Sequence, residues 1–297
     1  MSSSEMQSDA ITLLEKTINI ILSCIIRMIS IELITKGESE LSSVLESIFS
    51  QTFKDFEVVC ANASSDKSTK ELLKEYNCKI IDIPINTGHL KARYLAHKSS
   101  IGERSLILDS TRPLENNALE MLINKYYEND MVIIREDSLG NGFWVNQAKK
   151  LKEIGEMQKQ RIEKETLAFL LPRFYRSSLL TEAFESIYKI TNVYFDKISY
   201  GEHHLIFEAC KKISNDVVIS DEILLSHYED DSLLNIIRKY YRYGHAQKIL
   251  KNFQGSVVND FSSHIRTGIN IKLRLETLPI NIARGIPFVV GYILNWY

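Results

Sequence analysis

The stretch Leu106–Leu114 places a single carboxylate, Asp109, at the end of an apolar run and follows it with two hydroxyls and Arg112. A strand that leaves a buried core and ends in an acid is the usual way in which an open α/β sheet presents a ligand contact. A helix cap is the other interpretation, because an acid ahead of Pro113 is typical of a helix with proline in its first turn. The local sequence leaves both open.

The elements around Asp109 alternate between strand and helix patterns from residue 29 onward. Strands separated by helices of this length need right-handed crossovers and so form a parallel sheet. The first half therefore predicts a Rossmann-like nucleotide-binding layout. The expected strands are 29–35, 56–61, 78–84 and 104–109, and the expected helices are 41–51, 64–76 with Ser65 or Asp66 as cap, and 87–100.

Ligands bind such a sheet at the carboxyl ends of its strands. The tips to consider are 35–38, 61–66, 85–88 and 109–112, and the first of them begins with Thr35. No G-x-G-x-x-G follows the first strand and no G-x-x-x-x-G-K-[ST] occurs, which counts against dinucleotide enzymes and P-loop NTPases. A phosphate group must be held in another way.

Whole-chain properties exclude some classes of protein. The net charge of -2 is spread over interspersed acids and bases, so there is no electrostatic footprint for nucleic acid. Cysteines are too few and too scattered for a zinc site or a disulfide scaffold, which predicts a reducing cytoplasm. They are Cys24, Cys60, Cys78 and Cys210.

The second half continues with less regular patterns. A strand at 131–137 precedes a glycine-rich turn, and a long charged helix is expected around 149–165. The segment 171–184 indicates an irregular strand that leads into a helix. The remaining expected elements are helices at 118–127, 205–212 and 226–250 and a strand at 215–225, and the chain closes with an apolar, aromatic segment, 278–297, interrupted by Arg284, Pro287 and two glycines.

Three stretches, in this order, resemble the inverting family-2 glycosyltransferases of the GT-A fold, and the resemblance runs from about 29 to 244. Residues 41–59 are similar to the first helix and second strand of that family. Residues 85–96 are similar to its Asn-x-Gly followed by Ala-Arg, which places Arg93 on a matching position. Residues 201–205 resemble its acidic pair. The resemblance implies an α/β, Rossmann-like GT-A fold with a mainly parallel sheet flanked by helices.

Two motifs of that family are incomplete here. Asn62 stands where an acid commonly contacts the base or ribose of the donor, although an amide still donates and accepts hydrogen bonds. At the Asp-x-Asp metal motif only Asp109 is retained, with Thr111 as a neutral oxygen, so the resemblance implies a weakly held Mn²⁺ or Mg²⁺ at Asp109. Arg112 and Arg93 are the alternative, because arginine forks bind phosphate directly.

The acidic pair is also altered. Inversion requires a base on the face opposite the leaving group, and Glu202 and His203 match the pair, so either is a candidate for that base. The alternative is that Glu202 caps the helix and His203 lies at the surface. His204 and His227 have ordinary interpretations as packing or surface residues, although a downstream histidine is able to approach the diphosphate.

Both ends of the chain raise the question of a membrane. Arg238 and Arg242 lie four apart on one helical face, which predicts either phosphate binding or a solvated basic face. The segment 278–297 fits either a membrane interface or a core helix. At the amino end lies a strongly apolar stretch, 10–28, whose uninterrupted part, 18–26, is far shorter than the ~20 residues a bilayer needs. It predicts an amphipathic helix, or else residues that precede a true start at Met28.

The sequence therefore predicts an N-terminal segment, 1–28, a GT-A-like domain, 29–245, and a helical C-terminal extension, 246–297. The expected activity is inverting transfer from a nucleotide-sugar donor to a glycan or lipid-linked acceptor, in the cytoplasm or peripherally at the cytoplasmic face of a membrane. A catalytically degenerate binding module and a nucleotidyltransferase are the competing classes. The candidate nucleotide-sugar-binding residues are Thr35, Asn62, Arg93, Asp109 and Thr111.

Overall fold

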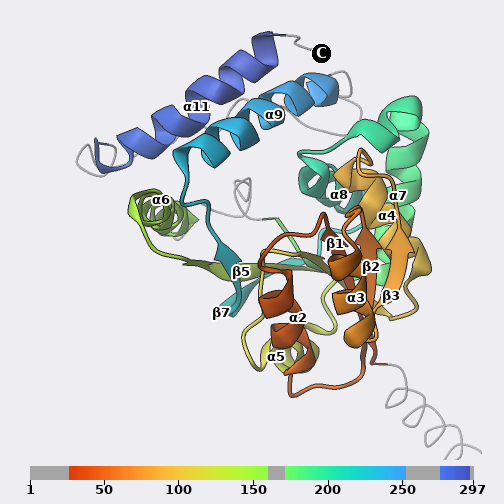
Figure 1. The fold of residues 1–297 in the computed structure, drawn as a ribbon. Coiled ribbons are helices and arrows are strands. Elements are labelled where there is room, and N and C mark those ends of the chain that lie inside the picture. Colours follow the sequence, from red (N-terminus) through yellow and green to blue (C-terminus); the bar gives the residue numbers. More distant parts are fainter. Residues whose placement is uncertain (1–26, 160–170, 252–274, 295–297) are drawn as a thin grey trace, which may run out of the picture.

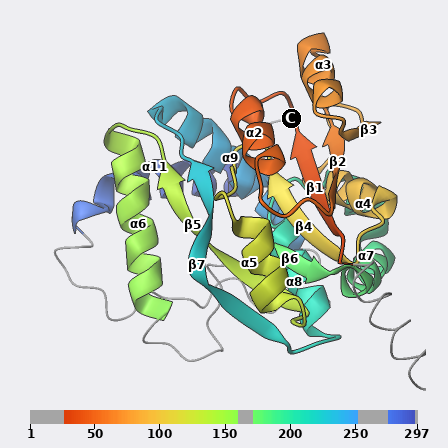
Figure 2. The same cartoon turned by 90° about the horizontal axis from the view of Figure 1, so that it is seen from below.

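The computed structural model describes residues 27–159, 171–251 and 275–294. Most of the expected segment 1–28, all of 160–170 and part of the expected extension 246–297 lie outside these ranges. Within the described ranges, seven strands form one sheet in the order β3-β2-β1-β4-β6-β5-β7 (Figures 1 and 2). The strands are β1 (Ile29–Thr35), β2 (Phe56–Asn62), β3 (Lys79–Asp82), β4 (Arg104–Asp109), β5 (Met131–Leu139), β6 (Phe174–Arg176) and β7 (Val217–Tyr228).

The sheet is mainly parallel, as predicted. β1 pairs in parallel with β2 and β4, and β5 pairs in parallel with β7. The short β6 is the exception, because it runs antiparallel to both β4 and β5. Consequently the chain enters β6 from the side of the sheet where the parallel strands end, and Arg173, directly before β6, lies beside Ile107 of β4, whose N–H donates to the Arg173 carbonyl at 2.8 Å.

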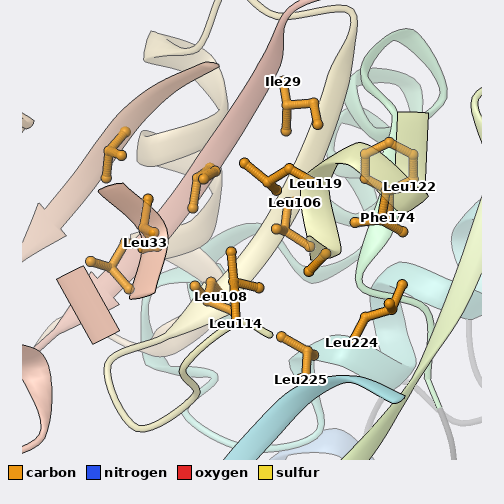
Figure 3. Packing of buried hydrophobic residues seen from close by; sticks show 14 of the residues in the cluster. Ile29, Leu33, Leu106, Leu108, Leu114, Leu119, Leu122, Phe174, Leu224 and Leu225 are labelled. Atoms are coloured by element: carbon orange, nitrogen blue, oxygen red, sulfur yellow. The ribbon is translucent and has the colours of Figure 1, made fainter. Parts of the chain in front are cut away.

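Helices cover both faces of the sheet because the buried strands are apolar on both sides. Leu106 and Leu108 of β4 pack into the core under one face, and Ile107 between them packs into a second core on the other face. Figure 3 shows the first core, in which Leu106 lies close to Leu119 and Leu108 lies close to Leu114. The first face carries α2 (Leu41–Phe49), α3 (Lys67–Glu75) and α5 (Ala118–Tyr126), and the second carries α4 (His89–Ser99), α7 (Ser177–Thr191), the 3-10 turn η1 (Asn192–Lys197) and α8 (Glu202–Lys211).

Three further helices lie beyond the carboxyl ends of the strands: α6 (Phe143–Lys159), α9 (Leu233–Lys251) and α11 (Leu278–Ile293). Helices α9 and α11 pack along one another above the sheet (Figure 1). Their backbones are in contact: a Cβ at Gly244 would lie 1.9 Å from the Phe288 carbonyl oxygen. Pro287 lies inside α11. Within the described ranges, no helix combines the length and apolar character needed to cross a bilayer.

The helix-cap interpretation of Asp109 is wrong. Helix α5 begins only at Ala118, after an N-cap at Asn117. The intervening segment is held extended against β7, since Leu114 forms a bridge with Leu225 and the Ser226 N–H donates to the Pro113 carbonyl at 2.9 Å. These backbone hydrogen bonds leave no helical turn for Asp109 to cap.

Three expected boundaries were also misplaced. Strand β5 continues to Leu139 because its last residues pair with β7, and Ser138 lies opposite His227. Residues 226–228 therefore belong to β7, and α9 begins at Leu233. The charged helix α6 begins at Phe143, directly after the glycine-rich turn. Asp66 caps α3 as predicted, by accepting from the Ser68 N–H at 3.0 Å.

Candidate functional site

A cavity of about 860 Å³ lies at the carboxyl edge of the sheet, under α9 and α11. Its floor includes Thr35 at the end of β1 and Asp109 at the end of β4, and its sides include Glu202 and His203 of α8. The volume falls in the range of small-molecule sites, which bury most of a ligand's surface. The edge predicted to bind ligand is therefore hollow, and charged side chains form part of its lining.

Asp109 is enclosed by three guanidinium groups. Oδ1 accepts from Arg93 of α4, and Oδ2 accepts from Arg112 in the turn that follows β4. Arg173, just before β6, places Nη1 3.3 Å from Oδ2. Burial alone would raise the pKa of Asp109, but these arginines hold it well below its ordinary value. Asp109 is therefore a carboxylate whose two oxygens are occupied.

Arg93 links Asp109 to Glu202. It is 1% exposed and does not itself line the cavity. Its Nε and Nη2 each lie 3.3 Å from Oε1 of Glu202. The helix-cap interpretation of Glu202 is wrong, because α8 begins at Glu202 after Gly201, whose φ of +76° favours glycine, and the carboxylate turns toward Arg93 instead. Glu202 makes no hydrogen bond through Oε2 to the described residues.

His203 is mostly enclosed, with 14% of its side chain exposed, and so is not the surface residue of the alternative interpretation. Its Nε2 lies 2.8 Å from Nη2 of Arg93 and 3.5 Å from Nη1 of Arg173. Burial and these two arginines lower the pKa of His203 well below its ordinary value. Because two guanidinium groups face Nε2 of His203, this nitrogen is placed to accept a hydrogen bond.

The residues at Asp109 do not fit a divalent cation. Mg²⁺ and Mn²⁺ require several hard oxygen ligands. Across the described residues, no group of three or more His, Cys, Asp or Glu is arranged to hold a metal ion. Both oxygens of Asp109 already accept from guanidinium groups, and a cation there would lie among three positive charges. This arrangement disagrees with the expected metal site at Asp109.

A second charged network occupies the side of the cavity formed by β5, β7 and α6. Glu136 accepts from Nε of Arg112 at 3.1 Å and lies 3.1 Å from Nζ of Lys152. Lys152 also lies 2.9 Å from Glu229, which pairs with Nδ1 of His227 at 3.1 Å. Burial and Arg112 lower the pKa of His227 to about 4, although Glu229 opposes the shift. His227 therefore lines the cavity and is not the ordinary packing or surface residue that the sequence suggested.

The other predicted donor-binding residues divide into two groups. Thr35 and Thr111 line the cavity, and the Thr35 hydroxyl donates to Glu38 at 2.8 Å. Asn62 does not line it, although its neighbours Ala61 and Ala63 do. Its amide donates to Asp82 on β3 at 3.2 Å and accepts from the Ser64 N–H at 3.0 Å. The amide therefore shapes the loop after β2.

Arg238 and Arg242 lie away from this site. They line a separate groove between α9 and α11, together with apolar side chains. The opposite face of α9 carries Tyr240 and Tyr243, which line the main cavity. Arg242 is still close enough to Lys36 to lower its pKa, after burial, which is the larger cause. The two arginines therefore mark the outer side of the helical layer that covers the cavity.

Sequence reasoning missed Arg173, Glu136 and Lys152. Arg173 reaches the site because β6 is antiparallel to β4: its backbone carbonyl accepts from the Ile107 N–H at 2.8 Å, and its side chain extends to Asp109 at the end of β4. The arginine that opens the irregular strand 171–176 was the available signal. To place Arg173 at the site from this signal, the direction of β6 would have to be known, and the sequence of a three-residue strand does not reveal it.

Comparisons with known proteins agree with this architecture. The family model described as Glycosyl transferase family 2 matches residues 30–183. The teichoic acid poly(glycerol phosphate) polymerase of Staphylococcus epidermidis is 31% identical over 103 residues, which is 33% of this chain but only 14% of that protein.

Two crystal structures of S. aureus TarS 1-349 superpose with a TM-score of 0.50. One is 20% identical and the match covers 90% of this chain and 81% of that one. The other, in complex with UDP, is 17% identical and the match covers 89% of both chains. At these identities the structures show a shared fold, the GT-A fold. On the family match over residues 30–183, this chain belongs to glycosyl transferase family 2.

Proposed function

We propose that this chain transfers a sugar from a nucleotide-diphosphate donor to an acceptor hydroxyl, with inversion at the sugar carbon. The observation that carries the proposal is a cavity at the carboxyl edge of a family-2 sheet that is lined by Arg112, Arg173 and Glu202. TarS, which shares the fold, was crystallised with UDP, and we extend that class of donor to this chain. A leaving diphosphate needs positive charge, and an attacking hydroxyl needs a base.

Glu202 is the better candidate for the base. Its carboxylate lines the cavity, and Arg93 binds one oxygen while Oε2 is left to accept the proton of an acceptor hydroxyl. The hydroxyl oxygen then bonds to the sugar carbon as the bond to the diphosphate breaks. His203 is a poorer base because Nε2 already faces Arg93 and Arg173, and a proton there would add a third positive charge.

The test of this activity uses a panel of UDP-, GDP- and dTDP-sugars. We expect at least one donor to raise the melting temperature and to be slowly hydrolysed. We expect Glu202→Gln to retain the thermal shift and to lower hydrolysis by about 100-fold or more. A thermal shift without hydrolysis would favour the binding-module alternative. The absence of both with every donor would contradict the proposed function.

We propose further that the acceptor is lipid-linked and that the outer face of α9 and α11 rests on an anionic membrane surface. Apolar side chains on this face are exposed, among them Ile237 at 38%, Ile286 at 61% and Val290 at 36%. Arg238 and Arg242 lie in the same groove. Apolar groups bordered by arginine are typical of interfacial helices, and the inner face of the same helices covers the cavity.

Vesicle sedimentation tests the membrane contact. We expect the protein to pellet with vesicles that contain phosphatidylglycerol and less with pure phosphatidylcholine. Ile286→Glu should reduce pelleting, whereas Ile101→Glu, at a 74% exposed site before the amino end of β4, is the matched control. Equal pelleting of both variants, or none for the wild type, would contradict the proposal.

A further inference from the structure

We infer that the diphosphate of the donor is held by the guanidinium groups of Arg112 and Arg173, without a divalent cation, and that Asp109 serves to anchor these two arginines. The inference rests on the proposed function, because it concerns how that donor is bound. It departs from the metal site that the incomplete Asp-x-Asp motif suggests.

The geometry leaves one edge of each guanidinium group for a ligand. Arg112 uses Nη1 for Asp109 and Nε for Glu136, at 3.1 Å. Arg173 uses Nη1 for Asp109 at 3.3 Å and for the Ile107 carbonyl at 3.4 Å. In neither residue does Nη2 hydrogen-bond to any described residue, and both side chains line the cavity. Two forks fixed in this way suit the oxygens of a diphosphate.

The charges point in the same direction. Arg173 shares its carboxylate partner, Asp109, with two other guanidinium groups, those of Arg93 and Arg112. The positive charge on Arg173 is therefore incompletely balanced by the residues around it. An anionic ligand against Arg173 would supply the missing negative charge in a largely enclosed site, where such contacts are strong.

A metal ion would have to undo this arrangement. To bind Asp109 it must displace Arg112 and Arg173 from Oδ2 or Arg93 from Oδ1. The displaced guanidinium group would then lie buried without its carboxylate, beside a divalent cation. Such a separation of buried charges is costly, whereas a diphosphate adds to the existing pairs without breaking them.

The first experiment measures binding of UDP, GDP, CDP and dTDP to the full chain by calorimetry, once in EDTA and once in MnCl₂. We expect at least one nucleotide to bind in EDTA with a Kd within about fivefold of that in MnCl₂. Binding that requires Mn²⁺, or is strengthened by it more than about fivefold, would overturn the inference and leave the proposed function standing. No binding in either buffer would overturn both.

Variants provide the second experiment, in EDTA and with the nucleotide that binds. We expect Arg173→Gln to weaken binding by about 10- to 100-fold, since charged hydrogen bonds are lost. The matched control is Arg176→Gln, which removes the same charge from β6, where Arg176 is 48% exposed and pairs with Asp130 at 2.7 Å. Equal affinity of the two variants would overturn the inference. If Arg173→Gln fails to fold, the EDTA comparison on the wild type still decides.

The variant Asp109→Asn distinguishes between two roles of Asp109, as an anchor for the arginines and as a metal ligand. An amide keeps the shape of the side chain but loses the charge that fixes Arg112 and Arg173. We expect weaker nucleotide binding in EDTA, and the same loss in MnCl₂. A loss confined to MnCl₂ would show that Asp109 binds metal and would overturn the inference.

Discussion

Arg93 of α4 and Asp109 of β4, 16 residues apart in the sequence, form an ion pair in which Arg93 is fully buried and Asp109 partly buried. The same guanidinium reaches Glu202, 109 residues further along the chain. Arg93 is outside the lining of the cavity, so its role is to fix the positions of two carboxylates that do line it. A single buried cation thus joins the expected donor side of the site to the candidate base.

Replacement of Arg93 by Met should therefore destabilise the fold as well as the site. Glu202 would lose its main charged partner while 7% exposed. We expect the free energy of unfolding to fall by about 3 kcal/mol or more, measured by urea denaturation. Arg176→Met, which removes a partner that is itself 48% exposed, should cost about 1 kcal/mol or less. Equal midpoints for the two variants would show that the buried pair contributes little.

The cover of the cavity depends on two helices in backbone contact. A methyl group at Gly244 would meet the Phe288 carbonyl at 1.9 Å, whereas one at Gly285 meets nothing within 4 Å. We expect Gly244→Ala to separate α9 from α11, to lower the melting temperature by several degrees and to weaken donor binding. Gly285→Ala, the matched control for stability, should raise the melting temperature slightly, since alanine favours helix. A melting temperature for Gly244→Ala at or above that of the wild type would contradict the close contact.

The fold was largely predictable because strong local signals agreed with one another. The four strands from β1 to β4 read as β-branched or aliphatic runs, and the helices between them repeat apolar residues at helical spacing. Family resemblance then supplied the overall architecture. Elements whose ends depend on pairing with a distant strand were harder to predict. Strand β5 extends to Leu139 because β7 lies beside it, and the local sequence of residues 137–139 does not indicate this pairing.

The site was predictable in part for the same reason. Strand ends were easy to locate, so Asp109 and Thr35 were found, and the residues matched to the family, Arg93 and Glu202, lie beside them. Arg173 was missed because its place depends on the direction of β6. The ion-pair partners of Asp109 were also not predictable, since the sequence does not show that guanidinium groups bind both of its carboxylate oxygens.

A second buried pair lies under the sheet, between Glu32 of β1 and His97 of α4. Oε1 of Glu32, a residue with no exposed surface, lies 2.8 Å from Nδ1 of His97, whose Nε2 is 2.8 Å from Thr181. We expect His97→Ala to lower the free energy of unfolding by about 3 kcal/mol or more, because a buried carboxylate then loses its partner.

The double variant Glu32→Leu/His97→Leu distinguishes the cost of an unpaired charge from the cost of lost packing. Because it removes the carboxylate together with its partner, we expect it to be more stable than His97→Ala, even though it changes two core positions. Urea denaturation of the three proteins measures the comparison. A double variant less stable than His97→Ala would show that the pair contributes more than the removal of a buried charge recovers.

The buried histidines should make the fold sensitive to acid, and His227 is the clearest case. Its folded pKa is about 4, lowered by burial and by Arg112, against about 6.5 in an unfolded chain. Glu229 and Glu136 oppose the shift, and Lys152 bridges those two carboxylates. The unfolded state therefore binds a proton between about pH 6.5 and 4 that the folded state does not. Stability from His227 is complete above about pH 6.5 and is lost as the pH falls toward 4.

His227→Gln should flatten this dependence. We expect the slope of unfolding free energy against pH to fall by up to about 1.4 kcal/mol per pH unit, the value for a difference of one bound proton between the two states. The slope is measured by urea denaturation between about pH 5.5 and 4.5. The exposed residue His245 on α9 provides the matched control, since His245→Gln should keep the wild-type slope. Parallel slopes for His227→Gln and the wild type would mean that His227 binds its proton equally in both states, contrary to its burial beside Arg112.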